Sequence, residues 1–354
     1  MSDPDSSPRI TRVWLVRPID DRSLESLRER LDRGVELQVG PREESETAGS
    51  LSAGGQILPG PEILVDGRPE EQWLIDHQAT LRSLVIPWAG LPKTTGERLR
   101  NWPSIRVYNL HHNAAPTAEM SLALLLAAAK RVVEGDQALR RGDWRIRYDL
   151  DERGPLLAGR TALILGYGSI GRRIARALNA LDMNVLGVRR SLPEGVQPGE
   201  IDRETGSAVF GRESLDELLP KAEVLMVSLP ATDQTTACLD ATRLDRLPTG
   251  AVVVNVGRAA VIDEWALYER LADQRIGAAG LDVWWRYPED EPRRRGTLPA
   301  DAPFGSLPNV VLSPHRAGHT DRTEALRMQH LADLLNRLHR DDPSLQALDL
   351  SRGY

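Results

Sequence analysis

The sequence predicts an α/β protein with two doubly wound parallel sheets. Short apolar runs alternate with helical stretches along most of the 354 residues, and a glycine-rich turn joins a run to a helix near the middle of the chain. The composition, 41% hydrophobic and 27% charged residues, is ordinary for a globular protein of two domains. We expect the first domain to comprise residues 1–116 and the second to comprise residues 117–316. The remaining residues, 317–354, are expected to return to the first domain.

Short apolar and β-branched runs in the first 116 residues predict a separate α/β unit. The predicted strands are 13–15, 36–39, 63–65, 83–86 and 106–109, with helices at 22–33 and 70–77. Residues 40–60, rich in Gly, Ser, Glu and Pro, are predicted to be a loop. Two longer helices follow: a buried one at 117–131 that crosses between domains, and a final one at 322–340 that packs back on the first domain.

The central motif starts with an apolar run that ends at Leu165 and continues as Gly-Tyr-Gly-Ser-Ile-Gly, residues 166–171. Gly166 allows a sharp turn, Gly168 lets a pyrophosphate approach the backbone, and Gly171 lets helix and strand pack closely. Apolar residues then recur at helical spacing, and a second predicted strand occupies residues 184–188. This context predicts a Rossmann dinucleotide-binding domain, with the phosphates at the helix N-terminus.

At the end of the second strand, where a carboxylate would bind the ribose hydroxyl of NAD, the chain has Arg189, Arg190 and Ser191. Guanidinium groups bind a 2′-phosphate in bidentate fashion, so this segment favours NADP over NAD as the cofactor. The alternative is a solvated arginine pair with no ligand, which leaves NAD possible.

Further strands are predicted at 223–228, 251–255, 277–282 and 310–312. Ligands of parallel sheets bind outside the carboxyl ends of the strands. Two side chains at those ends suit the reduction of a carbonyl: Arg258 can hold a carboxylate in a two-point contact, and His315 can exchange protons near neutrality. Taken singly, an arginine there is more often a surface charge and a lone histidine is more often structural.

Six ordered motifs make the chain resemble the D-isomer-specific 2-hydroxyacid dehydrogenases, a family that also contains glyoxylate/hydroxypyruvate, phosphoglycerate, formate and phosphite enzymes. The motifs are AEMSLALLLAAAKR, LGYGSIG, VSLPATDQTT, VNVGRAAVIDE, GAAGLDVW and LSPHRAGHT. The resemblance covers residues 80–330 and implies a discontinuous, flavodoxin-like substrate domain to which the last helix returns. It also implies a homodimer formed through the nucleotide-binding domain, for which we expect Gly135 to Asp151, with Trp144 and Tyr148, to be the contact segment.

The resemblance implies roles for individual residues. Arg258 binds the substrate carboxylate and polarises the carbonyl, His315 is the general acid/base, and Asp282 and Asn255 lie near the nicotinamide. The substrate-binding residues are Trp88, Ala89, Gly90, His112, Arg258 and His315. The cofactor-binding residues are Gly166, Gly168, Ser169, Ile170, Gly171, Arg189, Arg190, Ser191, Leu229, Pro230, Thr235, Val256, Gly257, Arg258, Asp282, His315 and Ala317.

One departure from the family pattern affects the histidine. Relatives have a glutamate that pairs with it, whereas Trp285 and Tyr287 stand at the acidic positions here. A carboxylate partner raises the pKa of a histidine, and a tyrosine hydroxyl only orients the ring. We therefore expect Tyr287 to join the catalytic residues and the pKa of His315 to be lower than in relatives. Glu289 or Glu291 could supply the acid from a displaced loop; the alternative is a solvated charge run.

A second departure is the pair His111 and His112, where relatives have small residues and proline. Either ring could line the pocket and favour an extra anionic or hydroxyl group on the substrate; a surface position at the hinge is an equal alternative. His315 and His319 are four residues apart, but no acidic ligand accompanies them, so we expect no metal site.

Composition limits the kinds of partner and the cellular compartment that we expect. The net charge of −6 and the scattered arginines argue against a nucleic-acid partner, and the single cysteine, Cys238, suits a reducing compartment. The polar N-terminus shows no secretory signal, and the longest apolar stretch, residues 122–129, is too short to span a bilayer, so we expect a cytoplasmic protein with no membrane partner.

The sequence thus favours an oxidoreductase that interconverts a small 2-ketoacid and a D-2-hydroxyacid. Two alternatives stay open: oxidation of formate, phosphite or a phosphonate-like acid, and a non-catalytic protein that senses NAD(P).

Overall fold

The computed structural model describes residues 9–17, 19–40, 52–53, 56–57, 60–149 and 153–350. The chain divides into two compact units, Met1–Asn113 with Thr320–Tyr354, and Ala114–His319. The two parallel sheets of the predicted fold class are present, one in each unit, which confirms that prediction. No helix in the described ranges has the length and apolar content needed to cross a membrane.

The first unit contains a five-stranded parallel sheet in the order β2-β1-β5-β6-β7. This is the flavodoxin-like strand order. The strands are β1 (Thr11–Leu15), β2 (Val35–Val39), β5 (Ile63–Val65), β6 (Ser83–Ile86) and β7 (Arg106–Asn109). The helices are α1 (Asp21–Arg30), α2 (Glu71–His77), α3 (Lys93–Leu99) and α11 (Thr323–His339), and β3 (Ser52–Ala53) pairs with β4 (Gln56–Ile57).

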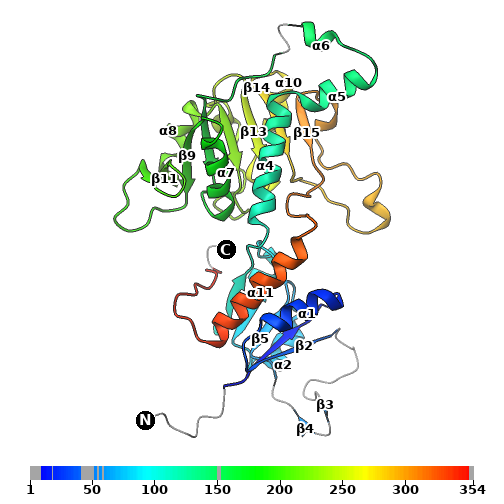
Figure 1. Ribbon diagram of the computed structural model, residues 1–354, viewed down its shortest axis with the longest axis vertical. Coiled ribbons are helices and arrows are strands. Elements are labelled where there is room, and N and C mark those ends of the chain that lie inside the picture. The colour runs from blue at the N-terminus through cyan, green and yellow to red at the C-terminus, as the bar shows by residue number, and fades with distance from the viewer. Residues whose placement is uncertain are drawn as a thin grey trace. The chain divides into compact units, whose positions relative to one another are not determined.

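Apolar clusters cover both faces of this sheet. On one face, α1 and α11 lie side by side and bury Leu27 and Leu335 (Figure 1). On the other face, Leu74 of α2 and Leu99 of α3 pack against the sheet. The last helix therefore completes a unit whose first segment ends at Asn113, more than 200 residues earlier.

The second unit contains an eight-stranded sheet in the order β10-β11-β9-β8-β12-β13-β14-β15, parallel except for β10. Its strands are β8 (Thr161–Leu165), β9 (Asn184–Arg189), β10 (Glu200–Asp202), β11 (Ser207–Gly211), β12 (Val224–Val227), β13 (Ala251–Asn255), β14 (Ile276–Leu281) and β15 (Val310–Leu312). Its α-helices are α4 (Ala114–Ala129), α5 (Val132–Arg140), α6 (Arg145–Tyr148), α7 (Ser169–Asn179), α8 (Leu215–Leu218), α9 (Ala241–Leu244) and α10 (Glu264–Ala272). Strand order reverses between β8 and β12, which is where such sheets bind ligands.

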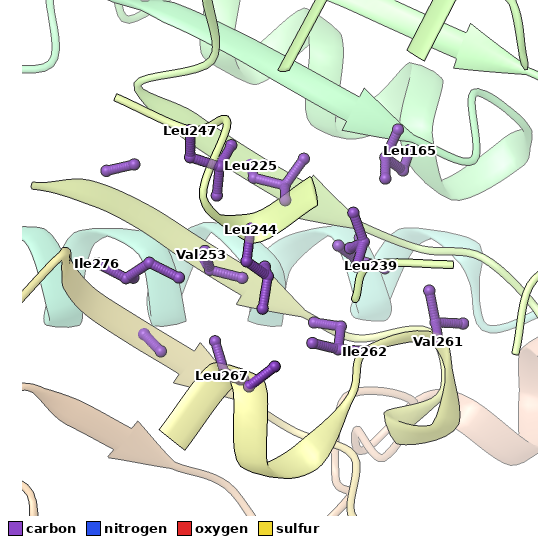
Figure 2. Close-up of a cluster of buried hydrophobic side chains, with 14 of the residues drawn as sticks. Leu165, Leu225, Leu239, Leu244, Leu247, Val253, Val261, Ile262, Leu267 and Ile276 are labelled. Atoms are coloured by element: carbon purple, nitrogen blue, oxygen red, sulfur yellow. The ribbon is translucent and has the colours of Figure 1, made fainter. Parts of the chain in front are cut away.

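Helices cover both faces of the eight-stranded sheet. Helices α4 and α7 pack together on one face (Figure 1), where Leu125 and Ile174 are fully buried. Figure 2 shows the cluster on the other face, in which Leu225 and Val253 of the central strands pack with Leu267 of α10. Asp263 caps α10 by accepting a hydrogen bond from the Ala266 amide at 2.8 Å. The sheet is thus rigidly held between two apolar layers, and its strand ends are fixed supports for side chains.

Several element boundaries differ from those predicted. Helix α4 begins at Ala114, three residues before the predicted start, because Pro116 is accepted in the first turn of a helix. Helix α1 ends at Arg30, since Leu31 already has an extended backbone. Strands β10 and β11 were not predicted. Most of the predicted loop 40–60, the first eight residues and Asp151 lie outside the described residues.

Candidate active site

The glycine turn after β8 has the shape required for close approach of a phosphate. Gly166 has a φ of +97°, and a Cβ there would lie 2.9 Å from the backbone of Ser228, whose hydroxyl donates to the Gly166 carbonyl at 2.9 Å. A Cβ on Gly171 would lie 2.3 Å from the Gly166 oxygen, whereas one on Gly168 would meet nothing within 4 Å. The two outer glycines are thus required by packing, and the middle one leaves the backbone open. Ser169 and Ile170 follow in the first turn of α7, whose leading N–H groups have no intrahelical acceptor.

Arginines gather at the ends of two neighbouring strands beside this turn. Arg189 ends β9 and pairs in register with Gly211 at the end of β11. Arg190 and Ser191 follow β9. Arg212 follows β11 and donates a hydrogen bond to the Gln234 side chain at 2.6 Å. Sequence reasoning missed Arg212 because the strand that positions it was not recognised.

The turn after β13 fixes the backbone of Arg258. Asn255 is 1% exposed; its side-chain oxygen accepts from the Gly257 amide at 3.0 Å and its nitrogen donates to the Arg258 carbonyl at 3.1 Å. A Cβ on Gly257 would lie 2.4 Å from the carbonyl oxygen of Leu229, so only glycine lets the two loops meet. The Arg258 side chain is exposed and can contact a ligand at this edge.

Asp282, at the end of β14, organises the loop that contains His315. This carboxylate is fully buried and accepts hydrogen bonds from the Ser313 hydroxyl at 2.5 Å and from the amides of Arg316 and Ala317 at 2.8 and 2.9 Å. His315 has a φ of +55°, a left-handed conformation that a non-glycine residue adopts only when its surroundings impose it. The three bonds to Asp282 come from residues on both sides of His315 and hold the loop in this conformation.

Tyr287 is the residue that contacts His315. Its hydroxyl lies 2.8 Å from Nδ1 of His315 and accepts a hydrogen bond from the Trp284 amide at 3.2 Å. Since the phenolic oxygen already accepts from that amide, its own proton is available for the imidazole. Trp285, at the other position where relatives have an acid, instead stacks on Phe304 with centroids 5.4 Å apart.

The surroundings disfavour the charged form of His315. Although the residue is exposed overall, the side chains packed around its ring remove it in part from water, and this desolvation together with the positive charge of Arg258 lowers the pKa of His315. The Asp282 carboxylate opposes the shift without overcoming it. Burial raises the pKa of Tyr287, which therefore stays protonated at neutral pH and gives the imidazole a hydrogen bond but no charge.

The nearby acidic residues do not replace the missing glutamate. Glu289 forms an ion pair with Arg293, and Glu291 with Arg294 at 2.8 Å. Glu289 and Glu291 thus belong to a solvated run of paired charges, the alternative considered from the sequence. No group of three or more His, Cys, Asp or Glu residues in the described part of the chain is arranged to hold a metal ion.

The remaining expected cofactor residues line the same strand ends. The Thr235 hydroxyl donates to the Pro230 carbonyl at 2.6 Å and closes the loop after β12. Val256 and Ala317 are buried. One edge of the sheet therefore holds the Gly168 backbone, the arginines after β9 and the loops after β12, β13 and β14. This arrangement fits a dinucleotide.

The expected substrate residues of the first unit also follow strand ends. The Trp88 ring packs on Gly67, with the Arg17 guanidinium 5.8 Å from its centroid. The Ala89 carbonyl, next to Gly90, accepts from the Asn109 side chain at 2.5 Å.

The relationship to known proteins agrees with this geometry. Residues 122–317 match the model of the D-isomer specific 2-hydroxyacid dehydrogenase NAD binding domain. The chain belongs to the D-isomer specific 2-hydroxyacid dehydrogenase family. This confirms the resemblance seen in the six motifs.

Two relatives illustrate the similarity. A glyoxylate reductase of Aeropyrum pernix is 38% identical over 220 residues, which cover 61% of this chain and 60% of that protein. A glyoxylate/hydroxypyruvate reductase B of Pectobacterium carotovorum is 36% identical over 265 residues, 74% of this chain and 77% of the relative.

Two solved structures share the fold. The D-isomer specific 2-hydroxyacid dehydrogenase of Xanthobacter autotrophicus Py2, in complex with NADPH and MES, has a TM-score of 0.73 at 23% identity and covers 98% of this chain and 100% of its own. The NADPH-dependent glyoxylate/hydroxypyruvate reductase of Sinorhizobium meliloti, in complex with NADP and sulfate, has a TM-score of 0.74 at 21% identity. The match covers 97% of this chain and 100% of that chain.

Proposed function

We propose that this protein reduces a small 2-ketoacid to the D-2-hydroxyacid, or catalyses the reverse, with a nicotinamide cofactor. The observation that supports this most is the Tyr287–His315 pair, held by Asp282 at the same sheet edge as Arg258 and the glycine turn. A protein that only bound the nucleotide would need neither a substrate guanidinium nor an oriented imidazole.

Each side chain has a defined task in the proposed reaction. Arg258 binds the substrate carboxylate and polarises the adjacent carbonyl. The nicotinamide, when bound, supplies the hydride to the carbonyl carbon or accepts it from the alcohol. The protonated His315 gives its Nε2 proton to the carbonyl oxygen during reduction and takes a proton from the alcohol during oxidation.

Tyr287 orients His315 in both protonation states. In the neutral imidazole the phenol donates to Nδ1, which leaves the proton on Nε2. In the imidazolium Nδ1 carries a proton and donates to the phenolic oxygen, which has a second lone pair free beside the bond from the Trp284 amide. The ring is thus held in place whichever way the reaction runs.

For the cofactor, we propose NADP rather than NAD. Arg189 and Arg190 at the end of β9 stand where the adenosine ribose would bind, and Arg212 adds a third guanidinium from β11. No carboxylate ends β9 to repel a 2′-phosphate. The two solved structures named above, which contain NADPH or NADP, share the fold and support this proposal.

We also propose that the protein is a homodimer whose contact segment includes α5 and α6. Several large apolar side chains there are exposed, among them Leu139 at 50%, Trp144 at 58% and Tyr148 at 74%. Exposed apolar patches of this kind mark protein contacts. Replacing Trp144 and Tyr148 by serine should convert the dimer to a monomer in sedimentation velocity, and a wild type that sediments as a monomer would contradict the proposal.

The function is tested with purified full-length protein and a panel of substrates. Glyoxylate, hydroxypyruvate and pyruvate are each offered with NADPH or NADH, and formate and phosphite with NADP⁺ or NAD⁺. We expect oxidation of NADPH by at least one ketoacid, with the D-alcohol found by chiral chromatography. Oxidation of formate or phosphite alone would replace the proposed substrate class, and cofactor binding without turnover would indicate a nucleotide-sensing protein.

A further inference from the structure

One side-chain hydrogen bond in the second unit joins two loops on opposite sides of the proposed adenosine site. Arg212, after β11, donates to the side-chain oxygen of Gln234, in the loop after β12, at 2.6 Å. We call these two side chains the Arg212 strap. Because the strands run in the order β11-β9-β8-β12, the strap spans the ends of β9 and β8. The glycine turn follows β8 and Arg189 ends β9, so the strap crosses the edge where the adenosine and its phosphates are expected.

The β11 side of the Arg212 strap has a rigid support. Tyr167, inside the glycine turn, is buried, and its hydroxyl donates to the carboxylate of Asp202 in β10 at 3.1 Å. Arg172 of α7 forms an ion pair with the same carboxylate at 3.3 Å. These contacts tie the antiparallel pair β10–β11 to the glycine turn and its helix. The backbone that carries Arg212 is therefore fixed relative to the turn proposed to bind the pyrophosphate.

The loop that carries Gln234 is held by its own threonines. The Thr235 hydroxyl accepts a hydrogen bond from the Thr232 amide at 2.8 Å and donates to the Pro230 carbonyl at 2.6 Å. The Thr236 hydroxyl donates to the Thr232 carbonyl at 2.8 Å. Both ends of the strap thus have a fixed backbone, whereas its two side chains are exposed. A change of hydrogen-bond partner in the strap requires only side-chain rotation.

Arg212 has a neutral partner at a position where an anion is expected. Within the part of the chain that the structure describes, it makes no ion pair, and the amide oxygen of Gln234 is its acceptor. A phosphate offers a guanidinium two charged acceptors at once, which an amide oxygen does not. Gly211 is in register with Arg189 on strands about 5 Å apart, so Arg212 begins beside the arginines proposed to bind the 2′-phosphate. Its charge is therefore available to a phosphate at this edge.

We propose that Arg212 exchanges its partner when the cofactor binds: it releases Gln234 and binds the 2′-phosphate of NADP. This inference rests on the proposed choice of NADP. In the free protein the amide holds the guanidinium at the adenosine edge. NAD has a ribose hydroxyl in place of the phosphate, so it offers no charge and leaves Arg212 with Gln234. Arg212 thereby determines cofactor specificity together with the arginines after β9, and Gln234 is the competitor that the phosphate displaces.

The test uses two fragments of the cofactor, so that it does not depend on turnover. Calorimetry with the full chain compares adenosine 2′,5′-bisphosphate with adenosine 5′-monophosphate, which differ only in the 2′-phosphate. The Arg212→Gln variant should bind the bisphosphate at least about fivefold more weakly and the monophosphate within about twofold of the wild type. The Gln234→Ala variant, which lacks the competing acceptor, should bind the bisphosphate about two- to fivefold more tightly. Arg294→Gln removes the same charge from a residue paired with Glu291 and should change neither affinity.

The possible results separate the exchange from the proposed function. An equal loss of both fragments in Arg212→Gln, or weaker bisphosphate binding in Gln234→Ala, would overturn the exchange, because the strap would then hold the adenosine of either cofactor. A wild-type preference for the bisphosphate that Arg212→Gln retains would also overturn it and leave NADP binding to the arginines after β9. A wild type without that preference would reject both NADP and the exchange. Bisphosphate binding that depends on Arg212, in a protein that reduces no ketoacid, would retain the exchange and reject the reaction.

Discussion

Replacing Tyr287 by glutamate tests how this protein controls the proton of its histidine. The change puts a carboxylate beside Nδ1 of His315, which the phenol now contacts at 2.8 Å. Two unit charges about 4 Å apart attract by ~1 kcal/mol in water and by ~4 kcal/mol at an effective dielectric of 20. Because His315 is exposed, screening keeps the gain near the lower figure, ~1–2 kcal/mol, or about one pH unit in the protonation midpoint.

The direction of the pH effect follows from the protonation state that reduction requires. Reduction needs the imidazolium, so its rate falls as the pH rises through the pKa of His315, which desolvation and Arg258 hold below the ordinary value. The wild-type limb should therefore lie on the acidic side of neutrality. The Tyr287→Glu limb should move upward by about one pH unit, whereas Tyr287→Phe, which adds no charge, should lower kcat without a shift of that size.

The assay is the pH dependence of kcat/KM for NADPH-dependent ketoacid reduction. Tyr268→Phe is the matched control, because this tyrosine packs against Trp265 and Phe304 in the same unit. Its profile should coincide with that of the wild type. A wild-type reduction limb that stays level well above neutrality, or an identical profile for Tyr287→Glu, would refute the reasoning.

Three further predictions concern the same unit. Arg258→Gln should lower kcat/KM for the ketoacid by about 10- to 100-fold, since a charge-assisted hydrogen bond is lost, while NADPH binding followed by fluorescence changes little; an unaltered kcat/KM would remove Arg258 from the site. Arg189→Ser combined with Arg190→Ser should reduce the NADPH/NADH ratio of kcat/KM at least about tenfold, and a constant ratio would leave the arginines as a solvated pair. Asp282→Asn removes one acceptor from the loop bonds at 2.5–2.9 Å, so thermal unfolding should show a loss of about 2–4 kcal/mol; a melting temperature equal to that of the wild type would contradict its anchoring role.

The sequence by itself determined the fold class and the glycine turn. Both depend on local patterns: apolar runs of strand length, helical spacing after Gly171, and glycines at the positions where a Cβ would collide with the backbone. The sequence also placed Arg258 and His315 at strand ends. Parallel strands present their carboxyl ends to one edge of the sheet, so these two residues were expected at that edge. Such inferences need only neighbouring residues and general rules of sheet geometry.

Tertiary structure decided how the side chains meet. The bond between Tyr287 and His315, which only the family resemblance had led us to expect, joins residues 28 positions apart, and Asp282 reaches Ala317 across 35. No periodicity in the chain encodes these partners, because each depends on where two separate loops leave the sheet. The same holds for Arg327 of the last helix, which lies within electrostatic range of His112 although more than 200 positions separate them. Long-range packing sets the charge and hydrogen bonding of these groups, and with them the lowered pKa of His315.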